Sequence, residues 1–249
     1  MERRRDAAVS TFYHDQPLES GATVSLPDAA AHHARVKRLV AGDGVRLTDG
    51  AGRIATGAIT RMSKSAVDVE LGSVRRIARP APLELYAPVG DRERMLWLAE
   101  KATELAITAW QPVVFRRSRS VSPRGEGAGF AAKIRARMIS ALEQSGGAWL
   151  PDVRPEIDVE AAARVAAPVA RYLLDPAGSA LDAAPAADGA AIILGPEGGF
   201  EPDEHGLLIA GGWRPARLAT TILRFETAGI AAVAIVRAAL TTLVEDTDG

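Results

Sequence analysis

The sequence contains no cysteine, which excludes disulfide bonds, thiolate nucleophiles and cysteine-ligated metals. It also lacks an apolar run of membrane-spanning length, and no apolar segment follows the basic residues 3–5 as a secretory signal would require. His32 and His33 have no third ligand at a suitable spacing, and neighbouring side chains diverge on a helix. We therefore expect a cytoplasmic protein with no membrane partner and no bound metal.

Charge, by contrast, is present in an uneven distribution. The formal net charge is −1, yet residues 1–80 hold 13 Lys/Arg against 9 Asp/Glu, and residues 111–154 hold 8 against 3. Such asymmetry favours a surface that meets a polyanion. Arginines scattered over a solvated surface would give the same counts, so charge alone leaves both interpretations open.

Short alternating segments separated by turn residues dominate the first third of the chain. The strands predicted from them are 45–50, 54–59 and 66–71. One helix is predicted at 28–39, with Asp28 as its N-cap. Residues 79–82, Arg-Pro-Ala-Pro, then interrupt the pattern. We predict a small β-barrel in residues 1–79 and a second domain in residues 80–249.

Beyond residue 82 the chain alternates between apolar strands and amphipathic helices. The strands are expected at 83–89, 110–115, 172–174 and 191–194. The helices are expected at 92–106, 130–144, from Pro202 onward, and at 226–243. Lys133 and Arg137 are four residues apart and share a face that is not the apolar one. This alternation predicts an α/β fold with a mainly parallel sheet.

Residues 194–200, Leu-Gly-Pro-Glu-Gly-Gly-Phe, follow an apolar strand and precede a helix. Their glycines let the backbone approach a ligand closely, at the carboxyl edge of a parallel sheet where such folds bind small molecules. The segment matches neither a Walker A loop nor a dinucleotide fingerprint. A plain structural turn would explain the glycines as well as a binding loop would.

Residues 218–228 form the second informative segment. We predict a short strand that ends at Leu223-Arg224, followed by the long terminal helix. Glu226 then lies in the first helical turn, where the helix dipole favours a carboxylate, so capping alone explains it. The alternative is a rigid loop that presents Arg224 and Glu226 beside the glycine loop.

Basic residues gather in two further places. Residues 116–120, Arg-Arg-Ser-Arg-Ser, follow a strand. They form either a solvated loop or a phosphate clamp, because arginine matches phosphate geometry. The helix at 28–39 is expected to face RNA, with an ordinary surface helix as the alternative, and its basic residues are His33, Arg35, Lys37 and Arg38.

Five segments in this order resemble one family, the 16S ribosomal RNA uridine-N3 methyltransferases of the SPOUT class. They are His33 with residues 35–38 and 42–43, Lys-Ala-Thr-Glu-Leu at 101–105, Glu-Gln-Ser-Gly at 143–146, and the segments 194–200 and 222–228. Each segment is modest alone, but the ordered set is specific and covers roughly residues 12–237.

The resemblance implies an N-terminal PUA-like RNA-binding β-barrel and a C-terminal SPOUT domain, an α/β fold whose last segment threads a deep trefoil knot. It implies S-adenosyl-L-methionine held in the knot, homodimers, and 16S rRNA or the 30S subunit as partner. The implied cofactor residues are Leu173, Leu174, Leu194, Gly195, Glu197, Gly198, Gly199, Leu218, Ile222, Leu223 and Arg224. The implied RNA contacts are His33, Arg35, Lys37, Arg38, Arg116, Arg117, Arg119, Lys133 and Arg137.

Methyl transfer to uridine N3 requires alignment of the reactants and loss of the N3 proton, but no metal. A nearby cation, Arg224 or Arg117, is expected to stabilise the imide anion and Glu226 to accept the proton, with Arg224 a stronger candidate than Glu226. Two alternatives stay open. One is a SPOUT methyltransferase for another RNA, such as a tRNA or 23S rRNA, and the other is a non-catalytic RNA-binding or ribosome-assembly factor.

The chain departs from the family pattern at four positions. Gly147 stands where an arginine usually follows Glu-Gln-Ser-Gly, and Arg117 or Arg119 is the expected substitute contact. The other three positions, which usually hold Gly, Arg and Thr, are Ala219, Thr221 and Phe225. Contacts made by backbone tolerate such changes of side chain.

Overall fold

The structure is a computed structural model that describes residues 10–120, 123–165, 170–183 and 189–245, without the side chains of 119–120 and 241–245. Contacts divide the chain into two compact units. The first contains the residues up to Arg79 together with Leu142–Leu150, and the second contains Pro80–Ala141 and the residues from Pro151 onward. The sequence pattern gave no sign that residues 142–150 belong with the first unit.

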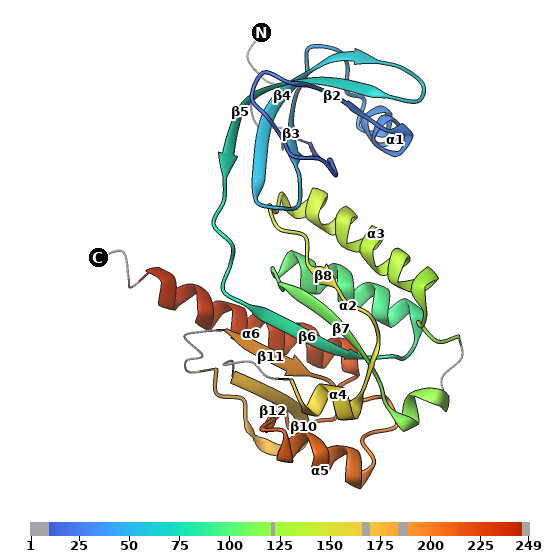
Figure 1. Ribbon diagram of the computed structural model, residues 1–249, viewed down its shortest axis with the longest axis vertical. Coiled ribbons are helices and arrows are strands. Elements are labelled where there is room, and N and C mark those ends of the chain that lie inside the picture. The colour runs from blue at the N-terminus through green and yellow to red at the C-terminus, as the bar shows by residue number, and fades with distance from the viewer. Residues whose placement is uncertain (1–9, 121–122, 166–169, 184–188, 246–249) are drawn as a thin grey trace. The chain divides into compact units, whose positions relative to one another are not determined.

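The first unit is built on a five-stranded sheet with the order β1-β3-β4-β5-β2 (Figure 1). Its strands are β1 Thr11–Tyr13, β2 Thr23–Leu26, β3 Gly44–Thr48, β4 Arg53–Met62 and β5 Val67–Arg76. β1 runs parallel to β3, and the other pairs are antiparallel. Alternating side chains such as Val67, Val69 and Leu71 fill one core, because successive residues of a strand face opposite sides.

Helix α1, Asp28–Val36, packs three alanines into that core. The prediction that Asp28 is the N-cap was wrong, since Pro27 holds that position without a side-chain cap. Asp28 instead lies in the first turn, where its carboxylate still meets the positive end of the helix dipole. The helix also ends before residue 39, because Arg38 adopts a φ of 56°, outside the helical range.

Residues 142–150 are joined to this first unit by hydrogen bonds. The Glu143 carboxylate accepts the backbone N–H of Tyr13 at 2.8 Å. The Gly50 carbonyl accepts the N–H of Leu150 at 2.9 Å, and Gly52 donates to the Ala148 carbonyl at 2.9 Å. The last residues of the helix that ends at Ser145, and the residues after it up to Leu150, therefore complete the first unit.

The second unit is built on a parallel sheet with the order β12-β10-β11-β6-β7-β8, and β9 also pairs with β7. Its strands are β6 Leu83–Pro88, β7 Ala109–Val114, β8 Asp152–Val153, β9 Ile157–Asp158, β10 Ala170–Ala180, β11 Ala190–Ile193 and β12 Arg214–Arg217. The helical segments are α2 Arg92–Glu104, the short 3-10 turn Arg116–Ser120, α3 Ala128–Ser145, α4 Val159–Ala163, α5 Pro202–Ala210 and α6 Phe225–Glu245. The predicted α/β fold with a parallel sheet is confirmed.

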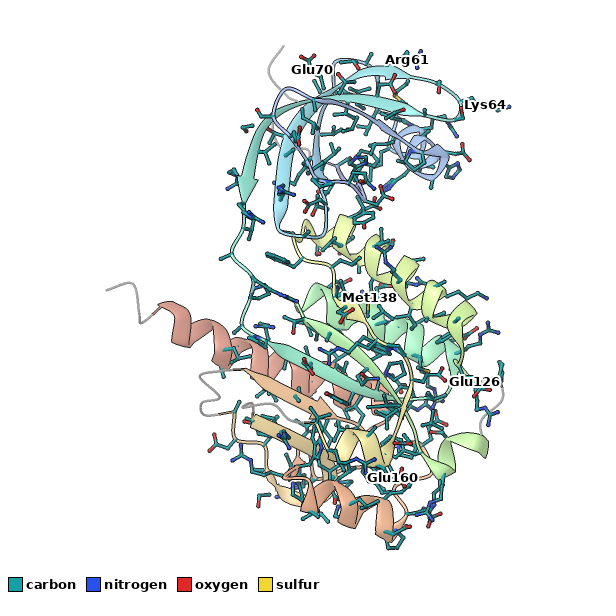
Figure 2. The ribbon with its side chains drawn as sticks, in the orientation of Figure 1. Arg61, Lys64, Glu70, Glu126, Met138 and Glu160 are labelled. Atoms are coloured by element: carbon teal, nitrogen blue, oxygen red, sulfur yellow. The ribbon has the colours of Figure 1, made fainter. Side chains whose placement is uncertain are left out.

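Helices cover both faces of this parallel sheet. α6 packs on β6 and β11 and against α2, whereas α4 packs against α5, β7 and β9 (Figure 1). Ala191 and Ile193 of β11 face the α4 and α5 side, where they join a core that contains Trp213. Met138 of α3, labelled in Figure 2, is fully buried, as the four-residue spacing of apolar side chains in that helix predicts. No helix among the described residues is long and apolar enough to cross a membrane.

The strand predicted to end at Leu223-Arg224 was wrong. The strand at this place is β12, Arg214–Arg217, and residues 218–224 form an irregular loop that leads into α6. The pairing of β12 with β10 ends at Arg217. Beyond that point no neighbouring strand among the described residues pairs with the apolar residues Ile222 and Leu223, so they form no strand.

Candidate functional site

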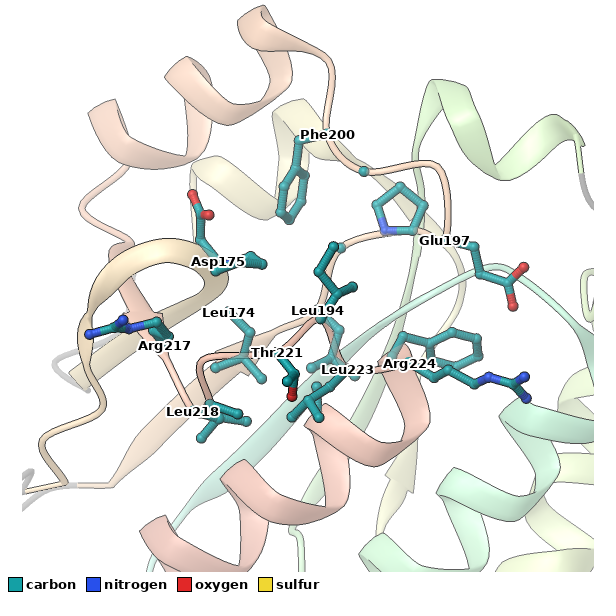
Figure 3. A pocket seen from close by; sticks show the side chains of 18 of the residues that line it. Leu174, Asp175, Leu194, Glu197, Phe200, Arg217, Leu218, Thr221, Leu223 and Arg224 are labelled. Carbon is teal, nitrogen blue, oxygen red and sulfur yellow. The ribbon is translucent and has the colours of Figure 1, made fainter.

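A cavity of about 520 Å³ lies in the second unit, where β11 and β12 end and the first turn of α6 begins (Figure 3). It is the carboxyl edge of the parallel sheet, as the sequence predicted for the glycine loop. Four leucines supply much of its apolar lining, and they are Leu174, Leu194, Leu218 and Leu223. The site therefore has an apolar inner surface and two flanking loops, residues 194–200 and 218–224.

The glycine loop, residues 194–200, has its own internal structure. Gly199 donates its N–H to the Pro196 carbonyl at 2.8 Å and adopts a φ of +75°, a conformation that side-chain-bearing residues rarely take. A Cβ on Gly195 would lie 2.9 Å from the Phe200 ring. Glycine is thus required here both by a turn and by a close approach, and the loop also lines the cavity.

Helix α5 follows the glycine loop, and a buried carboxylate fixes its start. Glu204 is 3% exposed. It accepts the backbone N–H of Glu201 at 3.0 Å and that of Arg116 at 2.8 Å. One side chain therefore joins the beginning of α5 to the segment after β7, and it satisfies two N–H groups that would otherwise be unpaired.

The basic residues 116 and 117 are bound to this same acidic helix start. Arg116 pairs with Asp203 and lies near Glu204. Arg117 Nε donates to Glu201 Oε1 at 2.9 Å, and its guanidinium also donates to the Gly198 carbonyl. The hydrogen bond from Arg117 to the Glu201 carboxylate holds the pKa of Glu201 below its usual value. Both arginines thus support the glycine loop, while the Arg119 side chain lies outside the described residues.

Arg94 is a site residue that sequence reasoning missed. It stands in the first turn of α2, where its N–H donates to the N-cap Asp91 at 3.0 Å, and it lines the cavity. Its guanidinium pairs with Glu197 of the glycine loop, and its Nε lies 3.8 Å from Glu226 Oε1. A cation in the first turn of a helix opposes the helix dipole, but Arg92 shares that placement, so no local signal singles out Arg94.

Glu226 and Arg224 have opposite surroundings. Glu226 is 7% exposed, its Oε2 has no hydrogen-bond partner among the described residues, and it does not line the cavity. Arg224 is exposed, lines the cavity, and forms no ion pair within the described part of the chain. Figure 3 shows the Arg224 and Glu197 side chains extending to the same side of the cavity. The loop 218–224 therefore exposes Arg224 at the cavity. Glu226, in the first turn of α6, is buried and lies next to Arg94.

The other residues expected to bind a cofactor line this cavity, with one exception. Leu173 is fully buried in the core between the sheet and α4, and it does not line the cavity. Asp175 lines it instead, with a carboxylate 2.8 Å from His205 Nε2. The further lining residues outside the sequence-based set are Arg94, Pro176, Pro196, Phe200, Ala216, Arg217, Ala219, Thr221, Phe225 and Ala228.

Two of the residues expected to contact RNA have partners within the first unit. His33 packs edge-on against Phe12 and lies 3.9 Å from the Glu143 carboxylate. Burial lowers the pKa of His33 and raises that of Glu143. Arg35 donates to the Lys64 carbonyl at 2.6 Å. In this segment His33 is half-buried, whereas Arg35, Lys37 and Arg38 are exposed.

In the second unit, Lys133 and Arg137 lie on the exposed side of α3, and Arg137 pairs with Glu100 at 3.1 Å. Within the described residues no group of three or more His, Asp or Glu side chains is placed to hold a metal ion. The chemical resources of the site are therefore the cavity, its two loops and a few charged side chains.

Both units of this chain are similar to parts of known RNA methyltransferases. Residues 78–237 match the model of an RNA methyltransferase domain, and residues 26–72 match that of an RNA methyltransferase PUA domain. A Ribosomal RNA small subunit methyltransferase E from Mycobacterium bovis is 30% identical over 238 residues, which cover 90% of each chain.

Two solved structures are similar over nearly the whole chain. A Ribosomal RNA small subunit methyltransferase E from Neisseria gonorrhoeae, bound to S-adenosyl methionine, is 28% identical with a TM-score of 0.84, covering 93% of this chain and 98% of its own. A putative methyltransferase from Legionella pneumophila, in complex with the same cofactor, has the same identity and TM-score, covering 94% and 98%. This chain therefore belongs to the RNA methyltransferase family that includes the ribosomal RNA small subunit methyltransferases E.

Proposed function

We propose that this protein transfers a methyl group from S-adenosyl-L-methionine to N3 of a uridine in 16S rRNA. The observation that carries the proposal is the cavity framed by residues 194–200 and 218–224 at the carboxyl edge of the parallel sheet. Two similar structures hold S-adenosyl methionine, and similar proteins are named as methyltransferases of small-subunit rRNA. These likenesses support both the cofactor and the class of RNA.

The residues of this cavity, hereafter the cofactor cavity, suit the proposed ligand. A volume of about 520 Å³ lies in the range of pockets that enclose nucleoside-sized molecules. Its leucine floor suits an adenine ring. Among the described residues, the loop 218–224 takes part in one hydrogen bond, from the Ala228 N–H to the Arg224 carbonyl, so its other backbone groups remain available to a ligand. The bound cofactor would supply a methyl group already activated by its positive sulfur.

The chain's own residues then have to align the uracil and remove its N3 proton. Arg224 is exposed at the cavity and without an ion pair among the described residues, so it suits the role of stabilising the imide anion. Glu226 is proposed to accept the proton, and Arg94, which pairs with Glu197, lies with its Nε 3.8 Å from the Glu226 carboxylate. The unsatisfied Oε2 of Glu226 supports a role in accepting a hydrogen.

Arg224→Ala tests this assignment. We expect methyl transfer to 16S rRNA to fall by at least about a hundredfold, the scale for losing a charged group that stabilises a transition state. The melting temperature should stay near that of the wild type, because the side chain is exposed. Arg217→Ala, at another arginine that lines the cavity, is the matched control and should keep most of the activity. Wild-type turnover by Arg224→Ala would remove Arg224 from the mechanism.

The base and the RNA are tested by nucleoside mass spectrometry. A strain that lacks the protein should lose N3-methyluridine from its 16S rRNA, and the purified protein should restore it. Unchanged N3-methyluridine would reject the proposed substrate. A thermal shift with S-adenosyl-L-methionine tests the cofactor separately, because a ligand that binds the folded state raises the melting temperature.

The remaining assignments concern partners and topology. We propose that residues 1–79 act as a PUA-like RNA-binding barrel, that the last segment of the second unit threads a trefoil knot, and that the protein is a cytoplasmic homodimer. Trp97 on α2 and Ile235 on α6 are 47% and 45% exposed on two helices that pack together, which supports an apolar partner surface. Sedimentation analysis of Trp97→Lys tests it, since a monomer is expected.

A further inference from the structure

A second cavity, of about 330 Å³, lies in the same unit and shares no lining residue with the cofactor cavity. Its deepest walls are the buried side chains Met95 of α2, Trp110 of β7, and Phe130 and Ile134 of α3. Gly125 is buried against Phe130 and Met95, whereas the exposed residues of the lining are Gly127, Ala128, Pro155 and Glu156. It is thus a mostly apolar slot, between a strand and two helices, that no part of the proposed cofactor site uses.

Trp110 gives this cavity one unusual polar feature. Its side chain is fully buried, yet the indole N–H has no hydrogen-bond partner in the described part of the chain. Trp213 is buried to the same degree, and its indole N–H donates to the Ala162 carbonyl at 3.1 Å. A buried donor without an acceptor costs about 1–3 kcal/mol, so such a group is seldom left unpaired. An acceptor from a ligand in the cavity would satisfy it.

Each cavity has one lining residue in the first turn of α2. Arg94 lines the cofactor cavity, and the next residue, Met95, lines the second cavity. Consecutive Cα atoms are about 3.8 Å apart, so only the width of the helix backbone separates the two lining positions. An RNA strand that places one base at the cofactor therefore brings its neighbouring nucleotides close to the second cavity.

The surroundings of the second cavity carry cations suited to an RNA backbone. The Arg92 guanidinium lies 5.5 Å from the centre of the Phe130 ring. Arg154 belongs to the lining, where it pairs with Glu84 and Asp152, and the lining also includes the carboxylate of Glu156. Lys133 and Arg135 are exposed on α3, the helix that supplies two walls. Phosphate contacts of this kind fix the position of a nucleic acid, while an adjoining pocket reads a base.

We propose that the second cavity receives an unstacked base from a nucleotide near the target uridine, with a carbonyl of that base accepting the Trp110 N–H. The inference rests on the proposed function in so far as the RNA is the substrate. Aromatic and thioether walls suit the π-face of any base. The N–H adds a requirement for a carbonyl, which uracil, cytosine and guanine have and adenine lacks.

Trp110→Phe is the first test, because it removes the N–H and keeps an aromatic ring. We expect the Kd for an unmodified 16S rRNA transcript to rise about fivefold to tenfold, the scale of one lost hydrogen bond. The Kd for S-adenosyl-L-methionine should not change. The melting temperature should fall, because the smaller ring leaves a void where Trp110 is fully buried, but by less than in Trp213→Phe, which also loses the hydrogen bond to Ala162. Trp213→Phe is the matched control and should lower the melting temperature while leaving the RNA Kd unchanged. Binding of the transcript by Trp110→Phe within twofold of the wild type would overturn the proposal.

A second test does not depend on the N–H. Ala131 lines the cavity from α3, and Ala131→Leu narrows it with another good helix former. One abasic nucleotide among the three on either side of the methylated uridine should weaken wild-type binding about tenfold, on the scale of one stacked base. The same abasic substitution should not weaken Ala131→Leu further, since the base has already lost its cavity. Equal losses in both proteins at every position would show that no base enters.

These RNA-binding measurements do not require methyl transfer, so they stay separate from the proposed function. If the wild type methylates no uridine, the proposed function fails, and the abasic scan is then made across the RNA segment that the protein protects from nuclease. If the wild type methylates uridine but both variants bind RNA normally, only the second cavity is rejected.

Discussion

The two loops of the cofactor cavity differ in how the protein holds them. Residues 194–200 are held by Arg94 at Glu197, by Arg117 at the Gly198 carbonyl, and by an internal turn at Pro196. Residues 218–224 have no such supports among the described contacts, and Ile222 is 88% exposed. One wall of the cavity is formed before any ligand arrives, whereas the other has backbone groups and an apolar side chain still to be covered.

This difference indicates a division of labour in ligand binding. A preorganised loop costs little conformational entropy when a ligand binds, so it favours affinity and a fixed geometry. A loop whose backbone groups have no partner loses conformational entropy when the ligand binds, but it can close around that ligand. We therefore expect changes in the glycine loop to damage binding strongly, and changes in the loop 218–224 to have smaller effects.

The largest effect is expected from Gly195→Val. The added side chain collides with the Phe200 ring, which packs against Phe115, so the preformed wall has to shift. Overpacking of this kind costs about 1–3 kcal/mol, which corresponds to roughly a tenfold to hundredfold loss in cofactor affinity by calorimetry. Gly206→Ala on α5 is the control, because a Cβ there meets nothing within 4 Å. Equal cofactor affinity in both variants would contradict a preorganised glycine loop.

Glu204→Ala should have the next largest effect. It leaves the N–H groups of Glu201 and Arg116 without their acceptor, at a cost of about 1–2 kcal/mol in the free energy of unfolding. The melting temperature should fall by about 2–4 °C per kcal/mol. Asp203→Ala, at a side chain 67% exposed, should change stability by less than about 0.5 kcal/mol. Equal melting temperatures for the Glu204→Ala and Asp203→Ala variants would contradict the role of Glu204 in holding the start of α5.

The loop 218–224 is probed by Ile222→Ser. We expect unchanged stability of the free protein and a loss in cofactor affinity of about threefold to tenfold, since part of an apolar side chain is no longer buried by the ligand. Hydrogen exchange makes the same point: amides 218–224 should exchange quickly until S-adenosyl-L-methionine is added, and Gly199 should be protected throughout. Similar protection of both loops in the free protein would remove the distinction.

The smallest effect concerns pH. The hydrogen bond from Arg117 lowers the pKa of Glu201 in the folded state, so this carboxylate stabilises the protein above its unfolded pKa. That contribution is lost as pH falls through the lowered value, on the acid side of the ordinary glutamate range. The gap between the melting temperatures of the wild type and Arg117→Ala, measured from pH 6 down to pH 3, should narrow. The hydrogen bond from Arg117 to the Gly198 carbonyl does not titrate and keeps a remaining gap at the acid end. A gap of constant size from pH 6 to pH 3 would show that Glu201 is not the group involved.

Much of the fold was predictable because its signals are local. Apolar spacing in α3 identifies the buried Met138, and alternation of strands and helices identifies the parallel sheet. The residues near 222–224 misled because residues such as Thr221 and Ile222 are typical of strands, while pairing with β10 ends at Arg217. Whether a neighbouring strand exists at a given residue is a tertiary fact that periodicity does not contain.

The candidate site was predictable where backbone defines it. The glycines of residues 194–200 indicate both a turn and a ligand, and that loop does line the cavity. Arg94 was missed because its role comes from two partners far along the chain, Glu197 and Glu226. Leu173 and Leu174 could not be told apart by type, since neighbouring strand residues point to opposite faces and only the second reaches the cavity.

The residues Leu142–Leu150 have a consequence for the order in which the protein is made. Gly50, Gly52 and Tyr13 find their partners in this segment, which is synthesised some seventy residues after the strands of the first unit. Domains generally fold as their residues leave the ribosome. The first unit is an exception in this respect, because it must remain incomplete on the nascent chain until residue 150 has emerged. A fragment that stops at Arg79 would keep its five strands but lack the acceptors and donors that complete them.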